Sequence, residues 1–411
     1  MSQQSQQSFS PAALVDFMER SFKVGLGSGV IFRTASPGDY TGSHVVVDGH
    51  SMANFASCSY LGLEQRAELR EAAIEAIRRY GTQLSISRAY LESPLYVELE
   101  DALRRITGGS VLVTTSTTAA HLSALPVLMR DHDVVVIDKA AHASLHTAVA
   151  LLHGTPVITL PHGRLDLLED KVHELARTHE HVWYVLDGLY SMSGEFAPFA
   201  RLAELLEREP RLHLYVDDAH ATSWCGRNGR GRALDVLPDK SRVVVALSLN
   251  KAFSAAGGAV VFPTDALRDR ARLCGGPMVF SGPIQPPMLG AAVASAQLHL
   301  RPEFVELQAQ LRMRIGYMHE VARRRGVPLA TSSETPIVNV QYPGVQGALA
   351  FTRRLWERGY FVSPSAPPAV PPERCGIRLT LSLNNSLADI EGLVEALGEE
   401  LAAGAEMATV A

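Results

Sequence analysis

A lysine, a carboxylate and a histidine follow two strand-like segments of this chain and could together hold an aldehyde cofactor. The apolar run 242–247 leads to Lys251, and small residues with a glycine pair come after it. The apolar run 212–216 leads to Asp217, and His220 follows closely. Pyridoxal phosphate (PLP) needs a lysine that forms a Schiff base and a carboxylate that faces its pyridinium nitrogen. The sequence therefore predicts a PLP site built around Lys251 and Asp217.

The chemistry of such a site explains why these residue types occur together. An anionic Asp217 would keep the ring nitrogen protonated, because an opposite charge favours the charged form, and the protonated ring is the electron sink. His220 could hydrogen-bond the phenolic oxygen of the ring. An isolated aspartate after a strand is more often a helix cap or a turn residue, and an isolated lysine is more often solvated. The two motifs in succession favour the cofactor site.

Three further segments could contact the same cofactor. His142, flanked by alanines, could stack on the ring, although a structural histidine is the alternative. Ser116, Thr117 and Thr118 stand between a strand-like run and a helical pattern. Hydroxyls and backbone N–H groups at a helix N-terminus bind phosphate well, and a plain helix cap is the alternative there. Ser248 could also donate to the phosphate.

An arginine within a strand-like run indicates a substrate site. Arg378 lies in the apolar segment 377–381. Burying an unpaired charge is costly, so a partner is required. A substrate carboxylate can pair with the guanidinium through two hydrogen bonds, and an internal Asp or Glu is the alternative. The glycine spacing over 226–231 is similar to a dinucleotide fingerprint, but no strand directly precedes it, so it is interpreted as a loop.

The composition is that of an ordinary globular enzyme. The chain has 411 residues, of which 46% are hydrophobic, and a net charge of −5. This charge gives no reason to expect nucleic acid or an anionic membrane as a partner. The four cysteines are scattered without metal-ligand spacing, which argues against a zinc site, and no metal is expected. We expect a cytoplasmic protein with no signal peptide, no membrane span and a disordered Ser/Gln-rich beginning.

Continuous apolar runs alternate with helical patterns from about residue 110, which predicts a mostly parallel sheet covered on both faces. Ligands bind beyond the carboxyl ends of such strands, where Asp187, Asp217 and Ser248 stand. The run 259–262 follows the lysine strand after a tight turn, so it is expected to be antiparallel to that strand. The other predicted strands are 111–113, 134–137, 157–160, 182–186, 212–216 and 243–247.

Three regions are expected along the chain. Residues 1–50 look like an N-terminal arm, 51–295 like the PLP-binding major domain, and 296–411 like a smaller C-terminal α+β domain. The small domain is expected to contain the strands 337–341 and 377–381.

Together these residues resemble the α-oxoamine synthases, which are PLP enzymes of fold type I, the aspartate aminotransferase-like fold. The resemblance extends over residues 50–400, approximately, and becomes specific through the number and order of its motifs. The motifs are residues 54–63, 142–145, 190–198, 217–220, 248–251, 280–281 before 286–287, and 377–381.

The resemblance implies a role for each candidate residue. It also places Cys58 and Ser87 among the substrate-binding residues. Lys251 would form the Schiff base and transfer protons, Asp217 would contact the pyridine nitrogen, and His142 would stack on the ring. His220 and Ser191 would contact the phenolic oxygen, and Ser248 would bind the phosphate. Ser281 would contact the partner subunit's phosphate, and Arg378 would bind the carboxylate of the amino acid.

The reaction that the resemblance implies is a decarboxylative Claisen condensation. An amino acid and an acyl thioester would give an α-aminoketone, free CoA and CO₂. The acyl carrier could be CoA or a carrier protein. The family also implies a homodimer with shared active sites.

Some positions depart from the family pattern and leave the substrates open. Cys58 replaces a usual asparagine, the segment 81–88 has few glycines, Thr117 and Thr118 replace a Gly-aromatic pair, and Asn384-Asn385 replaces a histidine. The Gly-poor segment 81–88 and the run 378–384 look most similar to the branch that makes long-chain α-aminoketone autoinducer precursors, so an unusual amino donor such as S-adenosylmethionine stays open.

Three alternatives remain at this point. The first is another fold type I enzyme, an aminotransferase or a carbon–carbon lyase. The second is a nucleotide-binding or scaffolding protein on a doubly wound sheet, in which Lys251 is structural. The third is a degenerate homologue that binds PLP and catalyses poorly, which the changes at Cys58 and Thr117 suggest.

Overall fold

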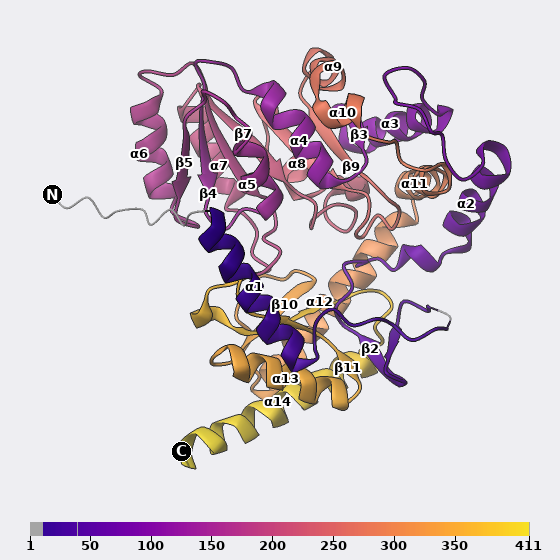
Figure 1. Ribbon diagram of the computed structural model, residues 1–411, viewed down its shortest axis with the longest axis vertical. Coiled ribbons are helices and arrows are strands. Elements are labelled where there is room, and N and C mark those ends of the chain that lie inside the picture. The colour runs from indigo at the N-terminus through magenta and orange to yellow at the C-terminus, as the bar shows by residue number, and fades with distance from the viewer. Residues whose placement is uncertain (1–10, 39, 411) are drawn as a thin grey trace. The chain divides into compact units, whose positions relative to one another are not determined.

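The computed structural model describes residues 11–38 and 40–410 (Figure 1). The predicted disordered beginning, residues 1–10, lies outside this part. The chain divides into two compact units, which we call the large unit (Cys58–Met313) and the small unit (Met1–Ser57 with Arg314–Ala411).

The large unit contains a seven-stranded sheet in the order β3-β9-β8-β7-β6-β4-β5. Neighbouring strands from β8 to β5 are parallel, and β9 is antiparallel to both β8 and β3. The predicted strands, including the antiparallel neighbour of the lysine strand, are confirmed. They are β3 (Ser110–Thr114), β4 (Val134–Asp138), β5 (Val157–Leu160), β6 (Val182–Asp187), β7 (Leu212–Asp217), β8 (Val243–Ser248) and β9 (Gly258–Phe262).

Burial on both faces explains the continuous apolar runs of these strands. Every residue of β4, β6, β8 and β9 is buried. Along β4, Val134 and Val136 belong to one apolar cluster, and Val135 and Ile137 belong to another. Successive side chains of a strand point to opposite faces, so each face of the sheet has its own core.

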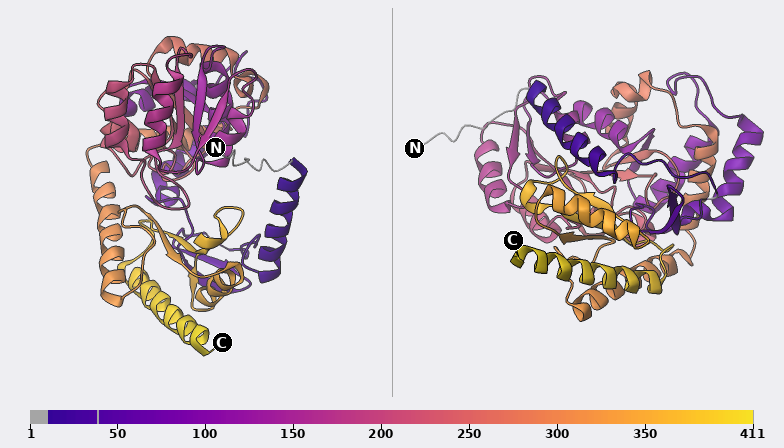
Figure 2. Two further views of the ribbon diagram at one scale, coloured as in Figure 1. Left: turned by 90° about the vertical axis from the view of Figure 1, so that its left-hand side faces the viewer. Right: turned by 60° about the horizontal axis from the view of Figure 1, so that its bottom comes forward.

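Helices cover both faces of this sheet, as Figure 2 shows. The helices of one core are α2 (Ala67–Tyr80), α3 (Pro94–Thr107), α6 (Leu165–Leu175), α7 (Phe199–Arg208), α8 (Arg232–Val236) and α11 (Pro286–His299). Those of the other core are α4 (Thr117–Leu128), α5 (Ala143–Val149), α9 (Asp265–Cys274) and α10 (Gly276–Phe280).

The small unit contains two three-stranded sheets. The first has the order β10-β13-β12 and is antiparallel, and the second has the order β1-β2-β11. Its elements are α1 (Pro11–Ser28), β1 (His44–Val47), β2 (His50–Asn54), β10 (Ile337–Gln341), α13 (Val345–Glu357), β11 (Tyr360–Phe361), β12 (Ser363–Ser365), β13 (Gly376–Thr380) and α14 (Leu387–Val410).

The N-terminal residues group with the C-terminal ones because β2 pairs with β11. This division differs from the predicted boundaries 1–50, 51–295 and 296–411. The second change of unit falls within α12 (Phe304–Arg325).

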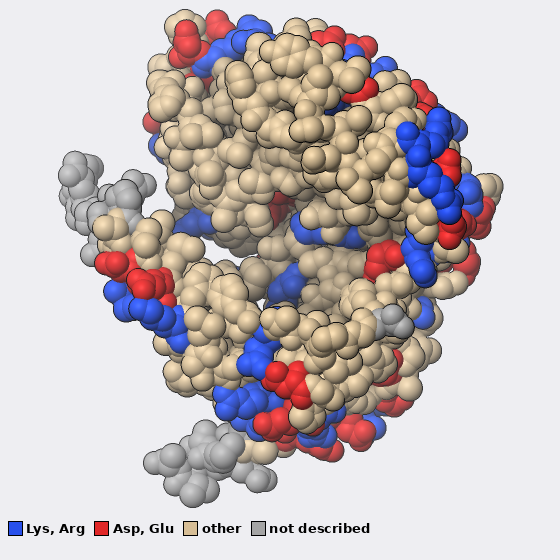
Figure 3. All heavy atoms as spheres, turned by 45° about the vertical axis from the view of Figure 1, so that its right-hand side comes forward, with Lys and Arg blue, Asp and Glu red and all other residues tan. Residues whose placement is uncertain are grey.

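The surface agrees with the weak net charge. On the face shown in Figure 3, acidic and basic side chains are interspersed and form no field of one sign. Within the described residues, no helix combines the length and apolarity needed to cross a bilayer.

Candidate active site

A cavity of about 140 Å³ opens among residues that follow the carboxyl ends of the parallel strands. This is the edge at which such sheets bind ligands. The structure thus brings together most of the residues predicted to hold the cofactor. The cavity is lined by Ser116, Thr117, Thr118, His142, Ser144, Asp187, Leu189, Asp217, His220, Asn250 and Lys251.

Asp217 ends β7 with a buried carboxylate that is already hydrogen-bonded. One oxygen accepts from the backbone N–H of Ala219 at 3.1 Å, and the other is 2.9 Å from Nε2 of His121. Burial alone raises the pKa of Asp217, but His121 and then Lys251 outweigh it and hold the pKa below its usual value. Asp217 is therefore anionic at neutral pH, as the pyridinium nitrogen of PLP requires.

His121 is a functional residue that the sequence analysis did not identify. It is fully buried in α4, and its Nδ1 lies 3.0 Å from the hydroxyl of Tyr215. Both ring nitrogens of His121 are therefore engaged, Nε2 with Asp217 and Nδ1 with Tyr215. The available signal was a histidine within a mostly apolar helix that follows the predicted phosphate-binding segment. Its partner Asp217 lies 96 residues further along the chain, so the sequence did not reveal the pair.

Asp187 adds a second carboxylate beside the first. It ends β6, directly opposite Asp217 in the sheet register. Its Oδ1 accepts from the backbone N–H of His142 at 2.9 Å. Burial raises the pKa of Asp187, and the negative charge of Asp217 raises it further. Two adjacent buried carboxylates resist double ionisation, so the negative charge is concentrated on Asp217.

His142 caps the N-terminus of α5 and lines the cavity. Its Nδ1 accepts from the backbone N–H of Ser144 at 3.2 Å and lies 2.6 Å from the Ser144 hydroxyl. Desolvation of the ring lowers the pKa of His142, despite the opposite effect of Asp217. The residue therefore presents a neutral ring of fixed orientation, which suits stacking on a flat cofactor.

His220 is fixed by a tyrosine from a distant motif. Its Nδ1 lies 2.7 Å from the hydroxyl of Tyr60, and both side chains are buried. The backbone carbonyl of His220 also accepts from the indole N–H of Trp224 at 2.6 Å. Tyr60 belongs to the motif 54–63, and its link to His220 was not expected.

Lys251 stands in a compact loop after β8. The backbone N–H of Ser254 donates to the carbonyl of Lys251 at 2.9 Å, which closes a tight turn. Ser248 is fully buried, and its hydroxyl donates to the side chain of Asn250 at 2.5 Å. Asn250, rather than Ser248, lines the cavity. Phosphate binding by Ser248 stays a prediction.

The phosphate-binding prediction fits the local geometry at α4. Ser116 caps this twelve-residue helix by accepting from the N–H of Ala119 at 3.0 Å. A Cβ on Gly258 would lie only 2.5 Å from the backbone nitrogen of Thr117, so only glycine allows β9 to pass this close. The helix N-terminus and the Thr117 and Thr118 hydroxyls suit a phosphate.

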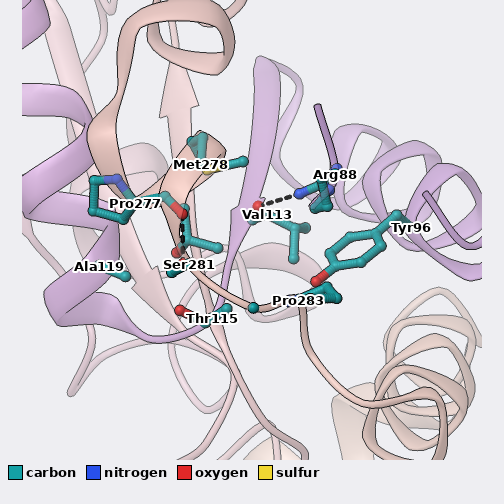
Figure 4. A pocket seen from close by; sticks show the side chains of 11 residues that line it. Arg88, Tyr96, Val113, Thr115, Ala119, Pro277, Met278, Ser281 and Pro283 are labelled. Carbon is teal, nitrogen blue, oxygen red and sulfur yellow. Dashed lines mark hydrogen bonds between the residues drawn. The ribbon is translucent and has the colours of Figure 1, made fainter. Parts of the chain in front are cut away.

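A smaller hollow of the large unit is lined by one other predicted residue, and a second lies beside its lining residue Arg88 (Figure 4). Ser281 lines it, and its hydroxyl donates to the carbonyl of Pro277 at 2.5 Å. The Ser87 hydroxyl donates to the carbonyl of Val279 at 2.7 Å. The adjacent Arg88 donates to the carbonyl of Val113 at 2.6 Å and lies 3.6 Å from the ring centre of Tyr96. These contacts attach the Gly-poor segment 81–88 to α10, β3 and α3.

Besides Ser87 and Ser248, three more predicted residues line neither space. Ser191 follows β6 and is half-buried, and Cys58 is a half-buried free thiol at the beginning of the large unit. Arg378 lies in the middle strand of the β10-β13-β12 sheet of the small unit and is only 8% exposed. Their predicted roles stay predictions.

One further polar cluster lies before β4, at the opposite end of that strand from the cavity. Within the described residues, Asp133, Glu180 and His181 are close enough together to hold a metal ion. However, the Asp133 carboxylate already accepts from the backbone N–H of Arg130, from His181 Nδ1 and from Trp183 Nε1. These bonds give the cluster a structural explanation.

The comparisons with known proteins agree with this geometry. The family described as aminotransferase class I and II matches residues 50–397. The chain belongs to this family.

A curated relative is the 8-amino-7-oxononanoate synthase of Geobacter sulfurreducens. It is 34% identical over 371 residues, which cover 88% of this chain and 92% of the relative. The Sphingomonas wittichii serine palmitoyltransferase has the same fold, with a TM-score of 0.87 at 21% identity over 97% of this chain and 99% of that one. The 8-amino-7-oxononanoate synthase from Francisella tularensis gives a TM-score of 0.72 at 21% identity, over 86% and 98% of the two chains.

The chain is thus a PLP-dependent transferase of fold type I and a member of the α-oxoamine synthases, as its motifs predict. The alternative of a nucleotide-binding or scaffolding protein receives no support from these comparisons.

Proposed function

We propose that this enzyme condenses an amino acid with an acyl thioester and releases CO₂ to give an α-aminoketone. The observation that carries the proposal is the single cavity that gathers Lys251, Asp217, His142 and His220, with the negative charge on Asp217. Bound PLP supplies the electron sink that stabilises the substrate carbanion.

The cavity residues bind and orient the cofactor in this proposal. Asp217 would keep the proton on the pyridine nitrogen, and the neutral ring of His142 would stack on the cofactor. His220, fixed by Tyr60, donates toward the phenolic oxygen. The N-terminus of α4 binds the phosphate.

Lys251 moves the substrate proton. Its amine would hold the cofactor in the resting enzyme, and it would take the proton from the substrate Cα and later return one. Arg378 holds the carboxylate of the amino acid. The acyl thioester accepts the new carbon–carbon bond, its thiol leaves as free CoA, and the carboxylate leaves as CO₂.

The names of the relatives favour 8-amino-7-oxononanoate as the product to test first. At 34% identity, however, the departures at Cys58 and Thr117 make longer acyl chains and an unusual amino donor the second set of substrates to test.

The test is an absorbance spectrum followed by a substrate screen. We expect the purified protein to show a band of covalently held cofactor that Lys251→Ala lacks and that the control Lys240→Ala retains. One amino acid with one acyl-CoA should then release CO₂ and free CoA in equal amounts. An absent band after addition of PLP would refute the cofactor site, and transamination without CoA release would favour the aminotransferase alternative.

We also propose that the active enzyme is a cytoplasmic homodimer. Large apolar side chains of the large unit are highly exposed: Tyr90 (84%), Leu91 (57%), Leu273 (75%) and Phe280 (89%). Tyr90 and Leu91 lie in the segment 87–92. Hydrogen bonds from Ser87 to Val279 and from Arg272 to Glu92 attach this segment to α10 and α9, which carry Phe280 and Leu273, so we group these side chains as one surface. Exposed apolar surface of this kind is typical of an interface.

The oligomeric state tests this surface directly. Light scattering after size-exclusion chromatography should give twice the chain mass for the wild type and the single-chain mass for Phe280→Asp. Val157→Asp, on the edge strand β5 at the other end of the sheet, is the matched control and should stay dimeric. A monomeric wild type would refute the proposal.

A further inference from the structure

The β10-β13-β12 sheet of the small unit has one apolar and one polar face. In the register of this sheet, Asn339 of β10 and Ser363 of β12 both stand directly opposite Arg378 of β13. Directly opposed residues point to the same face, so these three polar side chains form a row across the sheet. Val338 and Leu379 point to the other face and are buried.

Asn339 is the unusual member of this row. Its side chain is only 7% exposed, and neither Nδ2 nor Oδ1 has a hydrogen-bond partner. A buried amide without partners costs free energy, because it loses water and gains nothing in exchange. Native proteins contain few such groups, and each requires an explanation.

The polar neighbours of Asn339 do not share this property. The hydroxyl of Thr380, two residues along β13 from Arg378, donates to the carbonyl oxygens of Phe55 and Ser57 at 3.2 and 2.8 Å. Asn385 donates from its Nδ2 to the carbonyl of Asn54 at 2.9 Å. Those groups hold the small unit together, whereas the amide of Asn339 has no such structural task.

A carboxylate beside Arg378 would give this amide a partner. The two carboxylate oxygens offer about four acceptor positions, and a bidentate guanidinium uses two of them. An amide N–H in the next strand can use another, while its oxygen can accept from a guanidinium N–H.

We propose that Asn339 is a second donor to the carboxylate of the amino-acid substrate, which its Nδ2 binds together with Arg378. This inference rests on the proposed function, in which Arg378 holds that carboxylate. It makes Asn339 a residue that selects free α-amino acids over their carboxamides, because a carboxamide offers fewer acceptor positions and carries no charge.

The experiment compares the binding of amino acids and amides to the PLP-loaded protein. The probes are glycine, L-alanine and L-serine, each paired with its carboxamide, and binding is measured by titration of the cofactor absorbance. Asn339→Leu should weaken binding of the responding amino acid by about tenfold or more, since a hydrogen bond to a charged group is lost. Binding of the matching amide should change less than twofold, about the precision of such a titration, and the band of the bound cofactor should stay.

A matched control and a charged variant sharpen the comparison. Gln341→Leu changes the next residue on the same face of β10, which is exposed, and should leave both affinities unchanged. Asn339→Asp should weaken amino-acid binding by about a hundredfold, because its carboxylate repels the substrate and pairs with Arg378. If Asn339→Leu fails to fold, Asn339→Ala provides the same comparison.

The outcomes separate this inference from the function on which it rests. Equal weakening for amino acid and amide, or unchanged affinity for both, would overturn the role of Asn339 and leave the synthase in place. A wild-type protein that responds to no amino acid would overturn the proposed function and the inference with it.

Discussion

The polar side chains around the cavity of the large unit differ from Asn339, on the polar face of the small unit, in whether they already have hydrogen-bond partners. Around the cavity, the side chains that we propose to contact the cofactor are held by other side chains: Asp217 by His121, His142 by Ser144, and His220 by Tyr60. In the small unit, the amide of Asn339 is buried and has no hydrogen-bond partner. A cofactor that stays bound favours fixed partners, whereas a substrate that leaves after each turnover requires a group that is paired only while it is bound. The comparison predicts that mutations around the cavity will lower both turnover and the free energy of unfolding, whereas a mutation of Asn339 will affect substrate binding alone.

The largest effect is expected at Asp217. In Asp217→Asn the ring nitrogen loses its anionic partner, so turnover should fall by about a thousandfold and PLP should bind more weakly. Steady-state kinetics and PLP titration measure both. The surface variant Asp239→Asn is the control, and a tenfold loss or less would contradict the role of Asp217.

The next effect concerns stability and compares two leucine substitutions. His121→Leu leaves the buried charge of Asp217 with fewer partners and should lower the free energy of unfolding by about 2–4 kcal/mol. Asn339→Leu removes an amide without partners and should leave the free energy of unfolding unchanged or higher. Urea denaturation of the two variants measures the difference. Equal losses would remove the distinction between the two regions.

A shift in pH dependence should accompany the loss of His121. Because His121 holds the pKa of Asp217 low, His121→Asn should raise that pKa and move the acidic limb of kcat/KM to higher pH. The stability that comes from ionised Asp217 is present above the ordinary carboxyl pKa and is lost as pH falls through the lowered one. In the variant this pH-dependent stabilisation should be smaller, because the folded-state pKa of Asp217 lies closer to the ordinary one. A uniform decrease in rate with an unchanged pH profile would contradict the role of His121.

The smallest effect is expected at Tyr60. Tyr60→Phe removes one hydrogen bond to His220 and should reduce kcat by about threefold to tenfold, with little change in the KM for the amino acid. Tyr80→Phe, in the same unit, should have no effect. A change in KM alone would place Tyr60 at the substrate and not behind the cofactor.

Much of the fold was predictable from the sequence, but the helices α3, α8, α9, α10 and α11 of the large unit were not predicted. The helix α11 is apolar on all sides, since Leu289, Ala291 and Ala292 are all buried, so it lacks the alternation of apolar and polar faces. It packs closely on α2, where a Cβ on Gly290 would lie 2.5 Å from the carbonyl of Ala72. The helix α3 did carry a signal in its Ser93 cap and following proline, which the sequence analysis did not use.

The sequence by itself determined the succession of strands along the large unit, the antiparallel strand after the lysine loop, and the placement of Lys251 and Asp217 at or after strand ends. Those features follow from local periodicity and from the rule that parallel strands present their carboxyl ends to the ligand. Only the tertiary structure decided which side chains meet. His121 bonds Asp217 across 96 residues, Tyr60 bonds His220 across 160, and Asn339 stands opposite Arg378 in the sheet register. Such pairs depend on how distant elements pack together, and no local pattern of residues specifies that packing.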